Sequence, residues 1–178
     1  MPTGGIGEIT VSAPYVSKRY LNDEVATKNA KIYDTGGELW HRMGDVGYLD
    51  EQGRLWFCGR KKERVITAER TFYTDCCEAV FNTHKTVFRS ALIAFKANNQ
   101  TVPAVVIEPK SRLSQSETKS LFSELRRLAQ TCSLTEPIKN FCVYKNFPVD
   151  VRHNAKIHRL TLMRYFAKHP RYVHTIED

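Results

Sequence analysis

The chain has 178 residues, of which 42% are hydrophobic and 11% aromatic, and it carries a formal net charge of +8. This length suits one large domain or two small ones, and the composition is ordinary for a globular protein with a packed core. No apolar run reaches the roughly 18 residues of a membrane-spanning helix, and the first residues lack the basic and apolar regions of a signal peptide. We therefore expect a cytoplasmic protein without a membrane span.

The cysteines and histidines do not predict a metal site. The five cysteines, at positions 58, 76, 77, 132 and 142, are odd in number and include no C-x-x-C spacing. That pattern is typical of reduced thiols rather than of a disulfide framework or a zinc site. No metal-binding residue is predicted.

Glycine and charge divide the chain at one place. All nine glycines lie at or before Gly59, and residues 1–59 carry 6 basic and 8 acidic side chains against 21 and 11 in residues 60–178. A change of composition of this kind is typical of a domain boundary. We predict a β-rich segment at residues 1–60, a compact domain at 61–170 and a tail at 171–178, with the boundary at Arg60 to Lys62.

The first segment is predicted to consist mainly of strands. Residues Gly7–Pro14 alternate apolar and polar side chains and stop at a proline, as a half-buried strand does. A short helix or turn follows at Tyr20–Thr27, with Asn22 or Asp23 as its cap. Two further strands, Leu39–Leu49 and Arg54–Cys58, are joined by a polar turn at residues 50–53.

The second segment mixes strands with helices. A hairpin is predicted around residues 68–70, followed by a helix at Cys76–Asn82 that Thr74 or Asp75 caps. Ser114 and Glu117 form a capping-box pattern at the start of the clearest helix. The remaining predicted elements are strands at Ser90–Phe95, Val102–Glu108 and Lys139–Phe147, a loop at Pro148–Lys156, and a final helix bearing Leu160, Leu162, Met163 and Phe166. A short sheet with about three helices makes this a compact α+β domain.

One carboxylate and one guanidinium are candidates for ligand binding. Asp45 lies between Gly44 and Gly47, and Gly59-Arg60 follows near position 60. This pattern places the two groups at neighbouring strand ends, which suits a ligand with both a sugar diol and a phosphate. On spacing alone, a turn aspartate bonded to local backbone and an arginine in a surface salt bridge are the simpler interpretations.

The same stretch resembles the ribose-binding and hinge motifs of the adenylate-forming superfamily, which includes acyl-CoA synthetases, peptide-synthetase adenylation domains and luciferases. The family pattern is Thr-Gly-Asp-x-Gly-x-x-Asp-x-x-Gly-x-x-x-x-x-Gly-Arg-x-Lys. Met43 replaces the threonine, and the pattern is otherwise met at Gly44, Asp45, Gly47, Asp50, Gly53, Gly59, Arg60 and Lys62. This stretch and the later PVDVRHNAKIHR are most similar to the olefin β-lactone synthetases.

The resemblance implies roles for four residues. Asp45 and Arg60 would bind the nucleotide, and Lys62 would be the hinge before a mobile C-terminal domain. Lys156 would be the adenylation lysine, a cation that stabilises the charge formed when a carboxylate attacks the α-phosphate of ATP. Family members usually carry Ser-Gly or Thr-Gly before this lysine, whereas Asn154 and Ala155 stand here. Without the resemblance, Lys62 would be a solvated lysine in a basic run and Lys156 a lysine preceding a helix.

The resemblance also implies an activity. The chain would be the C-terminal portion of an ATP-dependent, AMP-forming enzyme that converts a β-hydroxy acid to a β-lactone through an acyl-adenylate. The phosphate loop and the magnesium-binding acid of the family are not found in these residues, so ATP and Mg²⁺ are the expected cofactors but the magnesium ligands are expected in a missing N-terminal part. We expect the chain to be inactive without that part, either as a truncated product or as half of a split enzyme with a separately encoded N-terminal half.

Two alternatives stay open. One is a fragment of a fatty acyl-CoA ligase, which shares the adenylation step but transfers the acyl group to CoA. The other is a non-catalytic basic module that binds nucleotides or nucleic acid. Because the basic residues are scattered through several predicted elements rather than clustered, nucleic acid is the less favoured partner.

Overall fold

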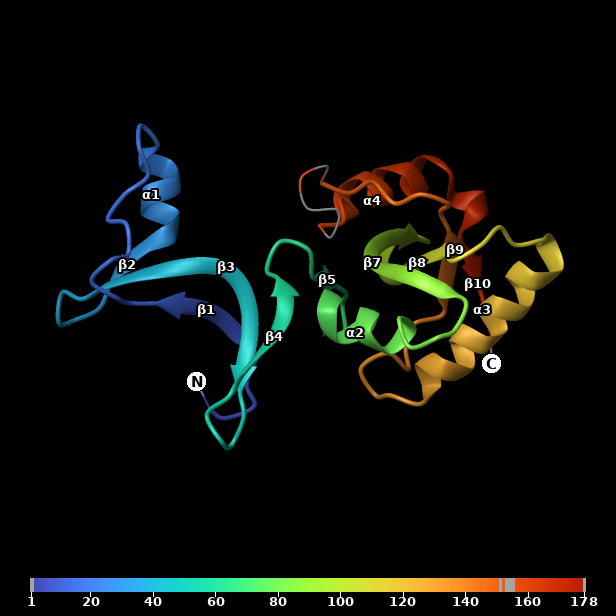
Figure 1. Ribbon diagram of the computed structural model, residues 1–178, viewed down its shortest axis with the longest axis horizontal. Helices are drawn as coiled ribbons and strands as arrows, with labels where there is room; N and C mark the ends of the chain where they lie inside the picture. Colours follow the sequence, from blue (N-terminus) through green and yellow to red (C-terminus); the bar gives the residue numbers. More distant parts are fainter. Residues whose placement is uncertain (1, 151, 153–155, 178) are drawn as a thin grey trace. The chain divides into compact units, whose positions relative to one another are not determined.

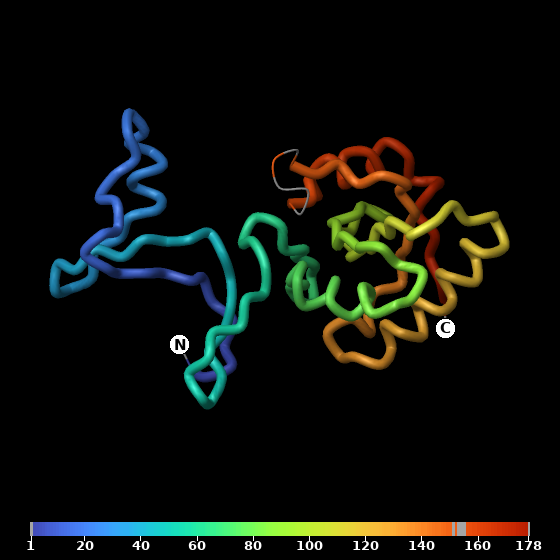
Figure 2. Tube along the Cα trace, viewed as in Figure 1, coloured from blue at the N-terminus to red at the C-terminus, as the bar shows by residue number. Residues whose placement is uncertain are grey.

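A computed structural model of the chain describes residues 2–150, 152 and 156–177. The chain divides into two compact units, Met1–Lys62 and Glu63–Asp178, and each is described by itself. Figures 1 and 2 trace both units along the sequence. No helix in the described residues is long and apolar enough to cross a membrane.

The first unit is built around one long strand. β3 (Leu39–Leu49) pairs antiparallel with β1 (Gly7–Val11), β2 (Lys31–Tyr33) and β4 (Leu55–Arg60), and Figure 1 shows it as a bent ribbon. A short helix, α1 (Glu24–Ala30), precedes β2. Of the two predicted caps, Asp23 is the one used, because its carboxylate accepts a hydrogen bond from the Ala26 N–H at 2.8 Å.

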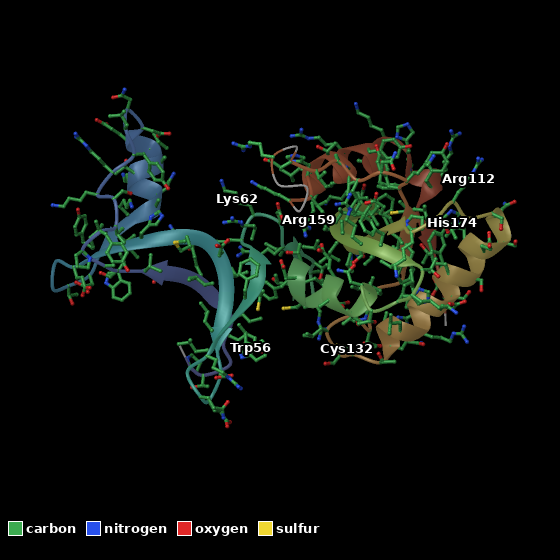
Figure 3. The ribbon with its side chains drawn as sticks, in the orientation of Figure 1. Trp56, Lys62, Arg112, Cys132, Arg159 and His174 are labelled. Carbon is green, nitrogen blue, oxygen red and sulfur yellow. The ribbon has the colours of Figure 1, made fainter. Side chains whose placement is uncertain are left out.

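Few apolar side chains are buried in the first unit. Within the described residues, its buried hydrophobic side chains are those of Val46 and Cys58. Three neighbouring apolar residues of β4, Leu55, Trp56 and Phe57, are each about half exposed, at 55%, 48% and 49%; Trp56 is labelled in Figure 3. This sheet therefore has only a small core of its own.

The second unit contains a four-stranded sheet in the order β10-β9-β8-β7. β7 (Val87–Ala97) and β8 (Gln100–Pro109) form a long antiparallel hairpin, and both turn residues, Asn98 and Asn99, adopt positive φ. β9 (Asn140–Val143) runs parallel to β8, and β10 (His174–Thr175) runs antiparallel to β9. A separate small hairpin, β5 (Val65–Ile66) with β6 (Thr71–Phe72), opens the unit.

Helices cover both faces of this sheet (Figure 1). They are α2 (Thr74–Phe81), α3 (Gln115–Gln130), α4 (Arg159–Lys168) and a 3₁₀ turn at Pro170–Tyr172. Leu92 of β7 packs with α2 and α3 in one cluster, and its neighbour Ile93 packs with α4 in another. Successive residues of a strand point to opposite faces, so a strand buried on both sides reads as a continuous apolar run.

The predicted α+β class is confirmed, as is the capping box of α3. The Ser114 hydroxyl accepts a hydrogen bond from the Glu117 N–H at 3.2 Å, and Glu117 Oε2 accepts one from the Ser114 N–H at 2.7 Å. The residues expected to form a tail, 171–178, contain β10, which extends the sheet beside β9.

Some predicted boundaries were wrong. β4 continues to Arg60 rather than ending at Cys58, because its pairing with β3 extends that far. α2 begins at Thr74, so the N-cap position falls on Tyr73 and no side chain caps the helix; the Thr74 hydroxyl donates to the Asp75 carboxylate at 3.2 Å. β9 ends at Val143 rather than Phe147, and its last pair with β8 is that of Val143 with Ile107.

Candidate functional site

Asp45 and Arg60 face each other across β3 and β4. They are register partners in the sheet, and Arg60 Nη1 lies 2.6 Å from Asp45 Oδ1. The Asp45 side chain is 16% exposed and the Arg60 side chain 55%. The carboxylate is thus fixed within the sheet, while the guanidinium is accessible to a ligand.

The Asp45 carboxylate keeps unused acceptor capacity. Its Oδ1 atom is buried, and no hydrogen bond of acceptable geometry reaches it from the described residues. The close contact with Arg60 is therefore an ion pair without an aligned N–H···O bond. Because an ionised carboxylate can accept several hydrogen bonds, Asp45 is able to receive hydroxyl groups of a ligand.

Two glycines shape the backbone around Asp45. Gly44 has φ +72°, in the left-handed region that favours glycine. At Gly47 an added Cβ would lie 2.5 Å from the Trp56 carbonyl oxygen, so the two strands approach closely only because this residue has no side chain. A register shift between Val46 and Gly47 marks a β-bulge, a feature that re-aims neighbouring side chains.

The chain after β4 is tied to the first unit as far as Lys61. The Lys61 N–H donates to the Gly44 carbonyl at 2.9 Å, and its Nζ donates to Glu8 Oε2 at 2.7 Å. Burial tends to raise the pKa of Glu8, but Lys61 and Arg42 outweigh it and hold the pKa below its ordinary value. Lys62 is exposed, and no hydrogen bond or ion pair joins it to the part of the chain that the structure describes.

Lys156 lies at the base of a loop in the second unit. Its carbonyl accepts a hydrogen bond from the Asp150 N–H at 2.9 Å, and Val149 and Ile157 form an antiparallel bridge next to it. Ile157 is buried in the cluster beneath α4, whereas Lys156 is exposed. The backbone of the lysine is therefore anchored, while no hydrogen bond or ion pair joins its ammonium group to the residues that the structure describes.

Asp150, at the start of the loop, is a carboxylate that neighbouring cations stabilise. Hydrogen bonds from Arg152, with a further contribution from the Lys156 charge, lower the pKa of Asp150. Asn154 and Ala155, which stand where the family pattern has a hydroxyl residue and a glycine, lie outside the described residues.

Arg159 forms a network that the sequence analysis did not single out. Its Nε and Nη2 atoms donate to the two carboxylate oxygens of Glu78 at 2.8 and 2.6 Å, and its Nη1 donates to Glu63 at 2.7 Å. Burial opposes the charge on Arg159, but Glu78 and Glu63 outweigh it and raise the pKa of the guanidinium. The partners are 81 and 96 residues away in sequence, so no local pattern points to them.

The structure brings two of the four predicted site residues together. Asp45 and Arg60 form one corner of the first unit, Lys62 ends that unit, and Lys156 lies in the second. Across the described ranges, no group of three or more His, Cys, Asp or Glu side chains is arranged to hold a metal ion.

Comparison with known proteins gives relatives in both sequence and structure, although no family model matches the chain. It is 41% identical over 172 residues to the olefin beta-lactone synthetase of Xanthomonas campestris pv. campestris, covering 94% of this chain and 31% of the relative. It is 44% identical over 163 residues to the olefin beta-lactone synthetase of Stenotrophomonas maltophilia, covering 89% and 29%.

A solved structure matches over the same extent. The o-succinylbenzoate coenzyme A synthetase of Bacillus subtilis, in complex with ATP and magnesium ion, superposes with a TM-score of 0.69 at 25% identity, covering 91% of this chain and 31% of that one. The same enzyme has been solved with an acyl-adenylate intermediate. The chain thus spans about a third of the length of the proteins it matches.

The fold defines the class: it matches that of adenylate-forming ligases, and the chain covers the C-terminal part of the proteins that it matches. Within that class, its close homologues are olefin beta-lactone synthetases.

Proposed function

We propose that this chain supplies the C-terminal part of an ATP-dependent, AMP-forming enzyme that converts a β-hydroxy acid to a β-lactone. The observation that carries the proposal is the Asp45–Arg60 corner, a carboxylate with spare acceptors next to an accessible guanidinium. The relatives at 41% and 44% identity are named olefin beta-lactone synthetases, which supports the choice of product.

In this proposal the first unit binds the nucleotide. Asp45 accepts hydrogen bonds from the two ribose hydroxyls, as acidic residues do in other nucleotide sites. A ligand there displaces Arg60 from its poorly aligned contact with Asp45 and leaves the guanidinium to pair with phosphate. No change of the backbone is needed, because Asp45 and Arg60 are already register partners across β3 and β4.

In this proposal Lys156 is the cation that stabilises the negative charge in the first reaction step. A carboxylate oxygen of the acid attacks the α-phosphorus of ATP, the bond to pyrophosphate breaks, and the acyl-adenylate forms. Two anions approach each other in this step, so a cation that contacts both oxygens lowers the barrier. In the second step the β-hydroxyl oxygen attacks the acyl carbonyl, loses its proton and releases AMP, which closes the lactone.

Lys62 is the proposed pivot between the two units. It is exposed and ends the first unit, while Lys61 before it is bonded to Glu8 and Glu63 after it is bonded to Arg159. A single residue with anchored neighbours on both sides absorbs a change of φ and ψ without loss of packing.

The magnesium ion that accompanies ATP does not fit any group of ligands in the described residues. We infer that its protein ligands lie outside this stretch of sequence. The steps assigned to Asp45, Arg60 and Lys156 are those of hydrogen bonding and charge stabilisation and do not pass through the ion.

The test is a complementation assay. The chain is mixed with the N-terminal part of the Xanthomonas campestris relative, a β-hydroxy acid, ATP and Mg²⁺, and pyrophosphate release is measured. We expect release from the mixture, and a fall in kcat of about 10²–10³-fold for Lys156→Ala, the usual effect of removing one charge-stabilising donor. Lys168→Ala removes another exposed lysine, at the end of α4, and is the matched control. Equal release from wild type and Lys156→Ala would remove Lys156 from this role.

A CoA ligase is the second candidate, because the matched Bacillus subtilis structure is that of a coenzyme A synthetase. Both candidates share the adenylation step and differ only in the group that displaces AMP. Adding CoA to the same mixture separates them: a β-lactone product supports the first candidate, and an acyl thioester supports the second.

A further inference from the structure

The guanidinium of Arg159 joins three segments of the second unit. Arg159 opens α4, three residues after Lys156, and is labelled in Figure 3. Glu63 is the first residue of the unit and directly follows Lys62. Glu78 lies on α2, and its Oε1 also accepts a hydrogen bond from the Leu92 N–H at 2.8 Å. The Arg159 side chain thus connects three segments: the end of the loop that contains Lys156, the start of the unit at Glu63, and α2 at Glu78.

These contacts are shielded from solvent. The side chains of Arg159, Glu63 and Glu78 are 14%, 18% and 7% exposed. Shielded pairs are screened by salt far less than exposed ones, and a two-pronged contact between guanidinium and carboxylate fixes direction as well as distance. A lysine carries a point charge on a flexible stem and does not reproduce this geometry.

The hydrogen bond that closes the Lys156 loop, residues 148–156, lies directly before Arg159. The His158 N–H donates to the Pro148 carbonyl at 2.8 Å, so the last bond of the loop lies next to Arg159. An Arg159 side chain held by Glu63 and Glu78 keeps the start of α4, and with it this bond, in one place.

We propose that Arg159 is a positioning residue, which couples the Lys156 loop to Glu63 so that a rotation at Lys62 carries the lysine as part of a rigid body. The proposal rests on the function proposed above, in which Lys156 stabilises the adenylation step. On the other side of the pivot, Lys61 is held by Glu8, so the freedom of the backbone is confined to Lys62.

Amide hydrogen exchange on the 178-residue chain tests the mechanical link without any activity. In Arg159→Lys, exchange at the Asp150 and His158 amides is expected to be about tenfold faster than in wild type, because the two-pronged contact is lost. Glu63→Gln keeps the contact with Glu78 and is expected to show a smaller increase. Wild-type exchange at both amides in both variants would overturn the proposal, and Glu63→Gln keeps it testable if Arg159→Lys fails to fold.

Glu108→Gln is the matched control for Glu63→Gln. Glu108 pairs with Arg89 across β7 and β8, and the side chains of Glu108 and Arg89 are 9% and 20% exposed. Glu108→Gln therefore removes the charge of a similarly shielded carboxylate from an arginine in the same unit. Arg89 also lies 5.6 Å from the centre of the Phe147 ring, so the control is read at the Asp150 and His158 amides, where exchange is expected to stay at the wild-type rate. Faster exchange at the Lys156 loop in Glu108→Gln would show that any lost ion pair loosens the loop.

The complementation assay then tests the role in catalysis. Glu63→Gln is expected to lower kcat for pyrophosphate release about tenfold with little change in the KM for ATP, whereas Glu108→Gln keeps both at wild-type values. Loop exchange that rises in Glu63→Gln while kcat stays at the wild-type value would overturn the positioning role. If the wild-type mixture releases no pyrophosphate, the proposed function fails, and the exchange result still decides whether Arg159 couples the loop to Glu63.

Discussion

At Gly47 two backbones approach too closely for any side chain. A Cβ there would lie 2.5 Å from the Trp56 carbonyl oxygen, an atom of the paired strand that cannot move without displacing β4. We expect Gly47→Ala to lower the free energy of unfolding of the first unit by about 1–3 kcal/mol. Urea unfolding followed by tryptophan fluorescence measures it, since both tryptophans, Trp40 and Trp56, lie in this unit.

Gly36→Ala is the control for this substitution. Its Cβ would lie 3.4 Å from the nearest atom, Asp34 Oδ1, which is an ordinary contact. Equal midpoints for Gly36→Ala and Gly47→Ala would show that the paired strands accommodate a side chain at Gly47 without loss of stability.

Asp45 itself is predicted to act on nucleotide binding rather than on the chemical step. Asp45→Asn removes the charge opposite Arg60 and replaces one acceptor oxygen by a donor, so ribose hydroxyls lose a partner. In the complementation assay, we expect the KM for ATP to rise about tenfold or more, the usual scale for a hydrogen bond to a charged group. Glu51→Gln, an exposed acid in the turn between β3 and β4, is expected to leave KM unchanged. A large fall in kcat without a change in KM would contradict the binding role.

Among the elements, α3 shows how a local pattern translates into stability. Ser114 and Glu117 satisfy each other's backbone N–H groups at the start of the helix. Ser114→Ala is therefore expected to lower the free energy of unfolding of the second unit by about 1 kcal/mol, measured by urea unfolding with circular dichroism. Ser123→Ala, in the middle of the same helix, serves as the control. An effect of Ser123→Ala as large as that of Ser114→Ala would remove the cap as the cause.

Glu8 makes the first unit sensitive to acid. It joins β1 to Arg42 of β3 and to Lys61 after β4, and these cations lower its pKa against the opposing effect of burial. An acid whose pKa is lower in the folded than in the unfolded state stabilises the fold above the unfolded pKa, here near 4.5, and loses this contribution as pH falls through the folded value. We expect Glu8→Gln to reduce the loss of stability below pH about 4.5, measured by tryptophan fluorescence in urea at several pH values. An unchanged pH profile in the variant would contradict this assignment.

These elements also show what local sequence determines. β3 and α3 were predicted closely because a glycine-bounded strand and a capping box are each encoded within a few neighbouring residues. The α2 boundary was missed because the helix begins at Thr74 without a side-chain cap, so neither Thr74 nor Asp75 marks its start as a cap would. The resemblance pointed to Asp45, Arg60 and Lys156, whereas the ion pairs of Arg159 join residues that only the folded chain brings together.

At the scale of the whole molecule, the two units differ in how much core they possess. The buried hydrophobic side chains of the first unit are Val46 and Cys58 within the described ranges, while the sheet of the second unit is covered on both faces. Because burial of apolar surface is the main source of stability, the first unit is expected to be the less stable of the two. Leu55, Trp56 and Phe57 of β4 are about half exposed, so they add little to the core of the first unit.

Unfolding of the chain in urea is therefore expected to follow two transitions. Tryptophan fluorescence reports the first unit, and the circular dichroism of α3 and α4 reports the second, so the fluorescence midpoint should fall at the lower urea concentration. Phe141 is fully buried on β9, where it packs against α3. Phe141→Ala should lower the free energy of unfolding of the second unit by about 3–5 kcal/mol and leave that of the first unit unchanged. Coincident transitions that both shift in Phe141→Ala would instead make the two units one cooperative body, and a pivot at Lys62 would then lack the independent halves it requires.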